Sequence, residues 1–572
     1  MVTPARKPSE EKRWMKYWED APVETESINA TVYDFLKASN TSDAAHLSET
    51  ALLYYDRKIS YGELFDKIEE TARAYCKIGV KAGDIVTVCS VMTPETIYSF
   101  YALDLLGATL NMVDPRTSSN GLHEYLKEVE SRFVLTISVA YEKMREAVLG
   151  TAVEKVIVNS PADSLPGVKK FLYNLKNKGG SYAPNVMLWQ DFAAAAANEP
   201  AVMPVPYDAE HAILIMHTGG TTGRPKGVLL SDRNLNALAL QYANKRIDKR
   251  QDSFLNVMPP FIAYGYGCGV HAPLHGGAVV ILIPQFEPEK LGKLMRKYHP
   301  NMMAGVPLHY QNLLNDSTVK NMDLSFLHTT GSGGDAITVE DEDIVNNFFA
   351  ERKAPYKLCK GYGMTEVSAC ACSCIREVNR RGSVGVPLSM TTVGIFKPET
   401  DEEVGYDTEG EICINTPTMM LGYYKMPDET DKVIRRHSDG KLWVHTGDLG
   451  KMDEDGFVFV LGRMKRVIIR HDGFKVFPYI IENEVMPLHG VDAACAVAVK
   501  DPEHHQGKLP FLFIKPMPGY EDHVALERML RKACAEDLPE YVQPAGYAFV
   551  DEFPYTKVGK VDYLALEKQA KL

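Results

Sequence analysis

Residues 218–227 have the sequence T-G-G-T-T-G-R-P-K-G, and this stretch decides the fold. The mostly apolar residues 211–216 before it predict a buried strand, and residues 228–241 after it predict a turn and then a helix. Glycine and hydroxyl residues between a strand and a helix can wrap backbone N–H and side-chain O–H groups around phosphates. Arg224 and Lys226 add positive charge to the same segment. The pattern therefore predicts a phosphate-binding loop in an α/β fold.

A Walker A loop, G-x-x-x-x-G-K-[ST], is the obvious alternative, but its spacing does not fit. Two residues separate Gly223 from Lys226, and Gly227 follows the lysine where a Walker A loop carries Ser or Thr. A Gly- and Thr-rich stretch taken alone more often forms a structural turn. The ordered series of Gly, Thr and Lys positions favours a phosphate loop of another class.

The composition excludes several classes of protein. The chain has 572 residues, 45% hydrophobic and 24% charged, which is typical of a soluble globular protein. A net charge of −12 argues against a dedicated nucleic-acid surface, so we expect no nucleic-acid partner. The N-terminus lacks the apolar segment of a secretory signal, and no apolar run approaches the roughly 18 residues of a membrane span. The ten cysteines include a C-x-C-x-C cluster at 370–374 that does not match zinc-site spacing, so we expect free thiols and a cytoplasmic location.

Alternating strands and amphipathic helices predict a parallel α/β sheet in the first part of the chain. The elements expected there are a helix from residue 62, a strand at 84–91, a helix at 94–106 and a strand at 108–115. From about residue 384, short strands separated by turns predict a β-rich section, and the last residues describe an α+β unit of about 110 residues. We also expect a short amphipathic helix over residues 9–18, docked on the body, and a surface excursion over residues 160–200.

Residues 218–227 match, at every position, the phosphate loop T-[SG]-G-[ST]-T-G-x-P-K-G of the adenylate-forming superfamily. The chain thus resembles acyl-CoA synthetases, firefly-luciferase-like enzymes and peptide-synthetase adenylation domains. Three further motifs follow in the family's order: G-Y-G-M-T-E at 361–366, H-T-G-D-L at 445–449 and P-Y-T-K-V-G-K-V-D at 554–562. The resemblance implies an AMP-binding catalytic domain over residues 1–462, layered from α/β subdomains and a β-rich subdomain. It also implies a small mobile α+β lid domain over residues 463–572.

The same resemblance implies a site for ATP and Mg²⁺. In the family the G-Y-G-x-T-E loop lies against adenine, its Thr contacts the α-phosphate and its Glu holds Mg²⁺, here Thr365 and Glu366. A lone carboxylate suits Mg²⁺, which keeps several waters. Asp448 would accept both ribose hydroxyls, a task for a two-oxygen acceptor, with Arg463 as the second ribose contact. The nucleotide-binding residues implied are Thr218, Gly219, Gly220, Thr221, Thr222, Gly223, Lys226, Gly334, Asp335, Gly361, Tyr362, Gly363, Thr365, Asp448 and Arg463.

Two segments correspond to the family's acyl pocket. Residues 331–336, G-S-G-G-D-A, resemble the S-G-G-[AE]-P-L stretch that floors the pocket, with Asp and Ala where the family usually has Ala or Glu and then Pro. Residues 258–267 align with the gate motif P-L-F-H-x-F-G, and Ile262 replaces the gate His. The implied pocket residues are Ile262, Tyr264, Gly331, Ser332 and Gly333. Glycines 265, 267 and 269 either line this pocket or pack a helix.

The implied reaction has two steps. A carboxylate attacks the α-phosphorus of MgATP to give acyl-AMP and pyrophosphate, and a thiol then attacks the acyl-AMP. Lys560 is the family's adenylation lysine and would supply positive charge, so the implied catalytic residues are Lys560, Thr365 and Glu366. Lys557 is a surface residue in this interpretation. The lid would rotate about Lys465 between the steps and present the thiolation residues Gly473, Phe474 and Lys475.

The sequence leaves the acid and the thiol open. No acidic residue stands in the gate motif to pair an ammonium group, which disfavours α-amino acids, and the apolar gate favours a fatty or aryl acid. We expect a ligase for a medium- or long-chain fatty acid that acts on small molecules with CoA as co-substrate. The resemblance also implies a homodimer, which would be common among relatives. The alternative is an enzyme that loads an acyl or aryl carrier protein. A catalytically silent binder is disfavoured because Lys560, Glu366 and the phosphate loop are all present.

Overall fold

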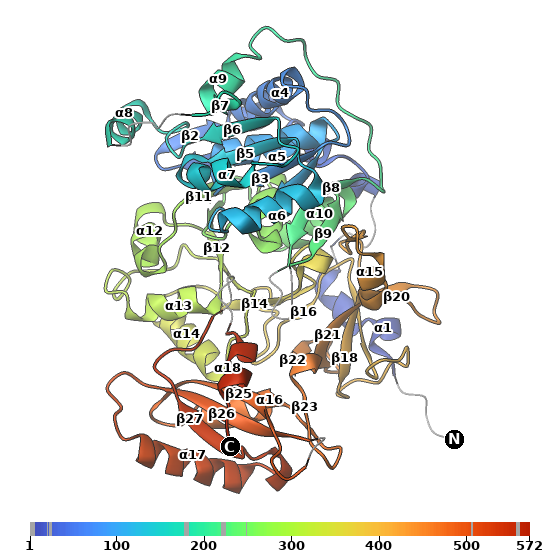
Figure 1. Ribbon diagram of the computed structural model, residues 1–572, viewed down its shortest axis with the longest axis vertical. Coiled ribbons are helices and arrows are strands. Elements are labelled where there is room, and N and C mark those ends of the chain that lie inside the picture. Colours follow the sequence, from blue (N-terminus) through green and yellow to red (C-terminus); the bar gives the residue numbers. More distant parts are fainter. Residues whose placement is uncertain are drawn as a thin grey trace.

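The computed structural model describes residues 6–19, 21, 26–176, 182–218, 225–247, 249–504, 507–555 and 561–572. Within these ranges the chain forms two large sheets, a smaller antiparallel sheet and a C-terminal unit with a sheet of its own (Figure 1). One large sheet lies at one end of the long axis and the C-terminal unit lies at the other. This is a mixed α/β architecture with a large N-terminal part and a small C-terminal part.

The first large sheet has eight strands in the part of the chain that is described. In spatial order they are β19 (Gly422–Tyr423), β9 (Gly227–Ser231), β8 (Ala212–His217), β4 (Thr109–Met112), β3 (Ile85–Cys89), β5 (Phe133–Ile137), β6 (Lys155–Asn159) and β7 (Val186–Leu188). Strands β8 to β7 are parallel, whereas β9 runs antiparallel to β8. The hairpin of β8 and β9 therefore presents the predicted phosphate loop at its tip.

The second large sheet has nine strands among the described residues. In spatial order they are β16 (Val386–Pro387), β15 (Cys372–Ser373), β14 (Cys359–Tyr362), β13 (Thr329–Ser332), β12 (Met302–Gly305), β10 (Ser253–Asn256), β11 (Val279–Leu282), β1 (Thr50–Tyr54) and β2 (Arg57–Ser60). Strands β10 to β14 run parallel, so the carboxyl ends of β12, β13 and β14 meet at one edge. That edge carries two of the predicted motifs.

Helices cover and separate these sheets. Those of the first half are α2 (Val32–Asn40), α3 (Ala44–Ser48), α4 (Tyr61–Lys77), α5 (Pro94–Leu105), α6 (Ser119–Val129), α7 (Tyr141–Ala147), α8 (Gly167–Lys176), α9 (Trp189–Ala194) and α10 (Asp232–Ala243). Later come the π-helix η4 (Tyr264–His271), α11 (Ala272–His275), α12 (Leu291–Tyr298), α13 (Pro307–Asn315) and α14 (Val339–Glu351). Every residue of α5 is buried, and its apolar side chains share one core with strands of both sheets. The spacing of apolar residues in α4 and α5 had predicted both helices to within about two residues.

The β-rich section is an antiparallel sheet. Its strands are β17 (Thr392–Phe396), β18 (Gly410–Asn415), β20 (Ile434–Arg436), β21 (Leu442–Met452) and β22 (Val458–Arg463). Helix α15 (Pro427–Val433) leads into β20. The long strand β21 pairs with β18 on one side and β22 on the other.

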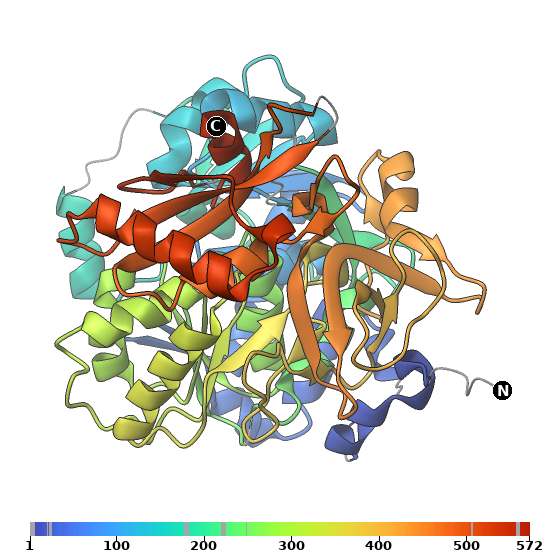
Figure 2. The same cartoon turned by 90° about the horizontal axis from the view of Figure 1, so that it is seen from below.

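The C-terminal unit has an α+β fold with its own core. Its strands are β23 (Ile468–Ile469), β24 (Lys475–Val476), β25 (Val491–Lys500), β26 (Lys508–Pro516) and β27 (Gly546–Phe549), and its helices are α16 (Pro478–Val485), α17 (His523–Asp537) and α18 (Tyr563–Gln569). Figure 2 shows α17 lying across the sheet, where Leu526 and Leu530 join Leu512 and Ile514 in a buried cluster. No helix of the described residues is long and apolar enough to cross a membrane.

Three local predictions need correction. The predicted turn after residue 227 is strand β9, because its apolar residues pair with both β8 and β19. The predicted helix over residues 9–18 is two pieces, α1 (Pro8–Glu11) and η1 (Arg13–Trp18), broken at Lys12 in a left-handed conformation. Its docking on the body is confirmed, since Trp14 and Trp18 are buried. The excursion at 160–200 contributes β7 to a sheet edge rather than lying wholly outside it.

A buried ion pair ties helix α14 to the edge of the second sheet. Lys360 on β14 pairs with Glu342 on α14, and both side chains are almost completely buried. Lys360 Nζ also donates to the Arg380 carbonyl at 3.2 Å, and Glu342 Oε2 accepts from the Gly382 N–H at 2.9 Å. The pair therefore holds the loop that follows β15 against α14.

Removing one partner of this pair leaves an uncompensated buried charge. We expect Lys360→Met to lower the free energy of unfolding by about 3–5 kcal/mol. The matched control is Lys353→Met, which breaks the exposed pair between Lys353 and Asp323 (2.8 Å) and should leave the unfolding midpoint nearly unchanged. Denaturant unfolding of the two variants compares them, and equal midpoints would contradict the assigned role.

Candidate active site

Three of the predicted nucleotide-binding residues meet at one carboxylate. The Tyr362 hydroxyl donates to Asp448 Oδ2 at 2.7 Å, and Arg463 Nε lies 2.9 Å from Asp448 Oδ1. Tyr362 ends β14, Asp448 lies in β21, and Arg463 ends β22 directly opposite Asp448 in the ladder. Burial, reinforced by the Asp448 carboxylate, raises the pKa of Tyr362 well above its usual range, so the phenol stays a donor. The structure thus assembles a carboxylate acceptor between an aromatic ring and a cation.

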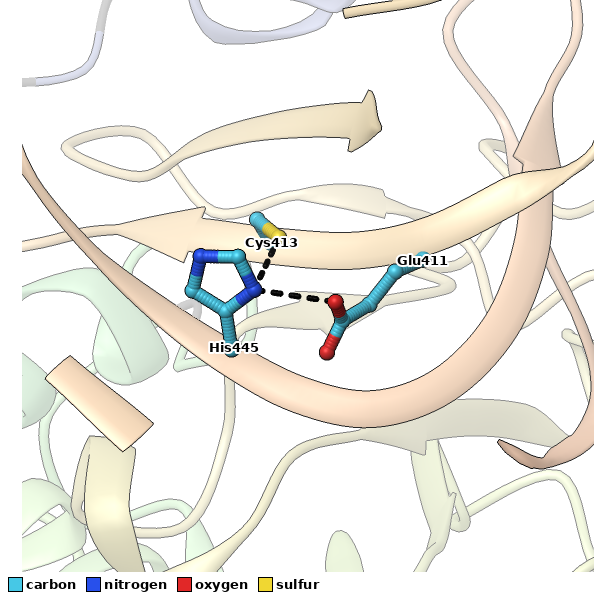
Figure 3. A group of neighbouring side chains, drawn as sticks. All are labelled: Glu411, Cys413 and His445. Atoms are coloured by element: carbon cyan, nitrogen blue, oxygen red, sulfur yellow. Dashed lines mark hydrogen bonds and ion pairs between the residues drawn. The ribbon is translucent and has the colours of Figure 1, made fainter. Parts of the chain in front are cut away.

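A buried network fixes the turn that carries Asp448 (Figure 3). Glu411 on β18 accepts from the Gly447 N–H at 3.0 Å and pairs with His445 Nδ1 at 2.9 Å. The Thr446 hydroxyl accepts from the Asp448 N–H at 3.1 Å. Gly447 has φ +69°, a backbone conformation that favours glycine. Asp448 therefore stands on a turn whose backbone is held from both sides.

The network continues away from the site. His445 Nε2 lies 2.8 Å from His437 Nε2, and Cys413 Sγ lies 3.6 Å from His445 Nδ1. Burial lowers the pKa of His437, which favours its neutral form at neutral pH. A hydrogen bond between the two Nε2 atoms needs one of them to carry a proton and the other to accept it, and a neutral His437 allows this.

Glu366, the predicted Mg²⁺ ligand, is buried and bonded to a tyrosine whose ring faces a lysine. Its Oε1 accepts from the Tyr423 hydroxyl at 2.6 Å, and Lys226 Nζ lies 4.7 Å from the centre of the Tyr423 ring. Lys226 also pairs with Glu429 on α15 at 2.5 Å. The bonds with Lys226 and Lys432 lower the pKa of Glu429 to about 2. One oriented carboxylate fits an Mg²⁺ that keeps most of its waters beside phosphates.

The structure describes only the two ends of the predicted phosphate loop. The Thr218 N–H donates to the Lys226 carbonyl at 2.9 Å, and the Lys226 N–H donates to the Thr218 hydroxyl at 3.1 Å. These bonds extend the ladder of β8 and β9 to the mouth of the loop. Predicted site residues that lie outside the described residues are Gly219, Gly220, Thr221, Thr222, Gly223 and Lys560. An antiparallel bridge between Tyr555 and Val561 joins the described residues on either side of the Lys560 segment.

Predicted acyl-pocket residues gather at the end of β13. The Tyr264 hydroxyl lies 3.4 Å from the Gly331 carbonyl oxygen, and a Cβ at Gly333 would lie 3.7 Å from the Tyr264 ring. Ser332 lies between the two glycines, and its buried hydroxyl has no partner among the described residues. Ile262 is half-buried near the start of η4, and its carbonyl accepts from the Gly265 N–H at 2.9 Å. The structure thus brings Tyr264, Gly331 and Gly333 into contact with one another.

The remaining predicted nucleotide-binding residues lie at or just after the carboxyl ends of β13 and β14. Gly334 has φ +83° just after β13, and the exposed Asp335 accepts from the Ala336 N–H at 2.9 Å. Gly361 pairs with β15, and a Cβ at Gly363 would lie 2.0 Å from the Ala369 carbonyl oxygen, so glycine is required there. Thr365 begins the short helix η6 (Thr365–Val367), and its carbonyl accepts from the Ser368 N–H at 2.9 Å.

The glycines of the gate motif pack the π-helix η4. A Cβ at Gly265 would lie 1.9 Å from the Pro259 carbonyl oxygen, and one at Gly267 would lie 2.5 Å from the Leu238 side chain. A Cβ at Gly269 would lie 2.6 Å from the Asn256 amide. Of the two interpretations left open by the sequence, helix packing is therefore the one that these contacts support.

The predicted hinge and thiolation residues lie at the start of the C-terminal unit. Lys465 is exposed in the short helix η7 (Met464–Arg466). Gly473 has φ +80° in the loop between β23 and β24, with open space around its Cβ position. Phe474 is 52% exposed and stacks on Tyr541 at 4.6 Å. The exposed Lys475 begins β24.

Several residues that orient the predicted site residues were not predicted from the sequence. Tyr423 and Glu429, which orient Glu366 and Lys226, carry no local signal because their partners lie 57 and 203 residues away in sequence. Glu411 does carry one: it is an acidic residue in the otherwise apolar strand G-E-I-C-I-N. A charged residue in a buried strand is rare unless it is paired. Glu411 therefore predicts a buried partner, but the sequence does not indicate which residue that partner is.

Asp448 is expected to be the main ribose acceptor. Asp448→Ala removes an acceptor with two partnered oxygens, so we expect the Kd for ATP to rise at least about tenfold. Tyr362→Phe keeps the carboxylate and the ring and should have a smaller effect. The control is Asp551→Ala, at an exposed position outside the site. Equilibrium binding of nucleotide measures all three, and an unchanged Kd in Asp448→Ala would refute the assignment.

Comparisons with known proteins agree with this geometry. The family model described as AMP-binding enzyme matches residues 39–424, and the model described as AMP-binding enzyme C-terminal domain matches residues 480–560. A long-chain-fatty-acid–CoA ligase of Bacillus subtilis (strain 168) is 29% identical over 566 residues, which cover 96% of this chain and 97% of that protein. A probable 4-coumarate–CoA ligase of Dictyostelium discoideum is 29% identical over 513 residues, 87% of each chain.

Solved structures share the fold. The ATP-bound MatB from Rhodopseudomonas palustris superposes with a TM-score of 0.81 at 24% identity and covers 95% of this chain and 99% of that one. The anthranilate CoA ligase AuaEII with anthranoyl-AMP has a TM-score of 0.78 at 19% identity, covering 96% of this chain and 98% of that one. Because the family model spans more than half of its length and the fold agrees throughout, this chain belongs to the AMP-binding enzyme family.

Proposed function

We propose that this chain is an AMP-forming acyl-CoA synthetase that joins a medium- or long-chain fatty acid to CoA through an acyl-AMP intermediate. The observation that carries the proposal is the pairing of Asp448 with Tyr362 and Arg463 at the strand ends. The buried Glu366 and Lys226, which both contact Tyr423, form a second group of the site. The relatives named as long-chain-fatty-acid–CoA ligases, which align over nearly the whole chain, support the CoA ligase assignment.

The proposed chemistry needs no protein nucleophile. A carboxylate oxygen attacks the α-phosphorus of ATP, forming an acyl–O–P bond and breaking the bond to pyrophosphate. A thiol then attacks the acyl carbon and releases AMP. Catalysis would rest on positioning and charge: Asp448 would hold the ribose, Lys226 and Lys560 would supply positive charge to the phosphates, Thr365 would contact the α-phosphate and Glu366 would hold Mg²⁺, which neutralises phosphate charge.

We assign the two steps to two positions of a mobile lid, residues 463–572. In one position the lid would bring Lys560 to the reacting groups, and in the other it would present Gly473, Phe474 and Lys475 to the thiol. The separate core of the C-terminal unit and the exposed Lys465 at its start support a rotation about that residue.

The choice of a fatty acid rests on the gate. Ile262 stands where the family has His, and no acidic residue in 258–267 can pair an ammonium group. Burying an unpaired ammonium is unfavourable, which argues against amino acids. The Tyr264 ring against Gly333 gives the assigned pocket an aromatic wall. The alternative, loading of a carrier protein, shares the first step and differs only in the thiol.

A panel of acids tests the substrate assignment. We expect medium- and long-chain fatty acids to give the highest kcat/KM for pyrophosphate release, above short-chain and aryl acids, and to give acyl-CoA when CoA is added. Mass spectrometry identifies the thioester. A preference for an amino acid would contradict the pocket argument, and transfer to a carrier protein but never to CoA would favour the alternative.

The proposed role of Lys560 in the first step can be tested separately from the second step. We expect Lys560→Ala to slow pyrophosphate release at least about 100-fold, because it removes a cation that stabilises developing charge. The same variant, supplied with synthetic acyl-AMP and CoA, should form acyl-CoA at nearly the wild-type rate. Lys557→Ala is the matched control and should retain both steps. If Lys560→Ala and Lys557→Ala behave alike, the lysine is misassigned.

A further inference from the structure

A cluster of two histidines and one aspartate lies in the C-terminal unit, outside the site described above. His471 Nδ1 is 3.2 Å and His504 Nδ1 is 3.0 Å from the same atom, Asp501 Oδ2. These three atoms all lie within 4.8 Å of one another. The two imidazole rings stack at 3.4 Å with an angle of 4° between their planes, so both Nδ1 atoms face one carboxylate oxygen. No step of the proposed reaction uses this cluster.

The cluster joins two loops that are distant in sequence. His471 lies between β23 and β24, and Asp501 and His504 lie between β25 and β26. The loops are in direct contact, since a Cβ at Gly507 would lie 2.8 Å from the His471 backbone nitrogen. The fold itself therefore brings the three side chains together.

Asp501 is oriented before any ligand arrives. Its Oδ1 accepts from the Glu503 N–H at 2.9 Å, and its own N–H donates to the Gly507 carbonyl at 3.1 Å. Burial opposes ionisation, but the hydrogen bonds from Glu503 and His504 lower the pKa of Asp501 below its usual value. The Asp501 side chain is 4% exposed, whereas His471 and His504 are 30% and 44% exposed. A fixed carboxylate thus lies beneath two imidazoles that solvent can reach.

These donors match the ligands of a borderline divalent metal. His504 Nδ1 is hydrogen-bonded to Asp501 Oδ2, and His471 Nδ1 lies close to the same oxygen. When each imidazole carries its proton on Nε2 and the two rings rotate out of their parallel stack, both Nδ1 lone pairs and Asp501 Oδ2 can bind one divalent cation, which leaves further positions for water. Two imidazoles and one carboxylate suit Zn²⁺, Co²⁺ or Ni²⁺ better than Mg²⁺ or Ca²⁺, which take mainly oxygen ligands. The hydrogen bond to Asp501 Oδ1 is the outer support that such ligands usually have.

The other group with metal-ligand chemistry among the described residues, Glu411, Cys413 and His445, is a weaker candidate. All three side chains are buried, and His445 already uses both ring nitrogens, toward Glu411 and His437. Glu411 also holds the turn before Asp448. The Glu411 group therefore has a structural role in positioning Asp448, whereas the cluster of His471, Asp501 and His504 has no role in the site described above.

We propose that His471, Asp501 and His504 form a binding site for a divalent transition metal on the C-terminal unit. The bound ion ties the loop of residues 470–474 to the segment of residues 501–504. The first of these loops contains Gly473 and Phe474. Any effect on thiolation rests on the function proposed above, but binding itself does not.

Zinc binding by the full-length protein tests the site without nucleotide, Mg²⁺ or activity. With Zn²⁺ as the probe and a chromophoric chelator as competitor, we expect one ion per chain at this site. His471→Ala and His504→Ala should each weaken that binding at least about tenfold, since even outer-support changes weaken metal sites 10- to 100-fold. The matched control is His489→Ala, an exposed histidine of the same unit whose ring lies against Tyr520, and it should bind as the wild type does.

Hydrogen–deuterium exchange locates the bound ion. Zn²⁺ should slow exchange in peptides that cover residues 470–474 and 501–504 in the wild type, and not in His504→Ala. The proposal is overturned if the wild type binds no Zn²⁺, if both cluster variants bind like the wild type, or if the slowing persists in His504→Ala. Thermal unfolding without metal checks that the variants fold. Because no readout uses ligase activity, failure here is distinct from failure of the proposed function.

Discussion

The Asp448 carboxylate, held between the Tyr362 hydroxyl and the Arg463 guanidinium, is the interaction on which the site depends. Tyr362 comes from a strand end of the second large sheet, and Asp448 and Arg463 come from paired strands of the β-rich section. One carboxylate therefore ties together two parts of the chain where the nucleotide is expected. Glu411 keeps this carboxylate in place by fixing the backbone of the Gly447 turn.

Charge is organised locally rather than across the whole protein. A net charge of −12 by itself opposes the binding of anionic ligands such as ATP and CoA. Lys226 and Arg463 each face the site while paired with a carboxylate, Glu429 and Asp448 respectively. These pairs hold long, flexible side chains in fixed positions before ligand arrives, which reduces the entropy lost on binding. The local electrostatic field near the phosphates, and not the net charge of the chain, determines how favourably anionic ligands bind.

Much of the fold could be predicted from the sequence because the signals for helices and strands are local. Apolar runs predicted β3 and β4, and apolar spacing predicted α4 and α5. Strand β9 was not predicted, because its apolar run is short and forms a strand through its pairing with β8 and β19. At the site, the motifs predicted that Tyr362, Asp448 and Arg463 would share a ligand, and the structure places them in contact. Tyr423 and Glu429 were not predicted because only the folded chain brings them to Glu366 and Lys226.

The central claim is that a fatty carboxylate attacks the α-phosphorus of ATP and is then transferred to CoA. The most direct test uses a long-chain fatty acid labelled with ¹⁸O in both carboxylate oxygens, with ATP and CoA, and mass spectrometry of the products. One labelled oxygen should appear in AMP, because the bridging oxygen of the acyl-AMP stays on phosphorus when the thiol attacks the acyl carbon. Unlabelled AMP, or label in pyrophosphate or inorganic phosphate, would contradict the account.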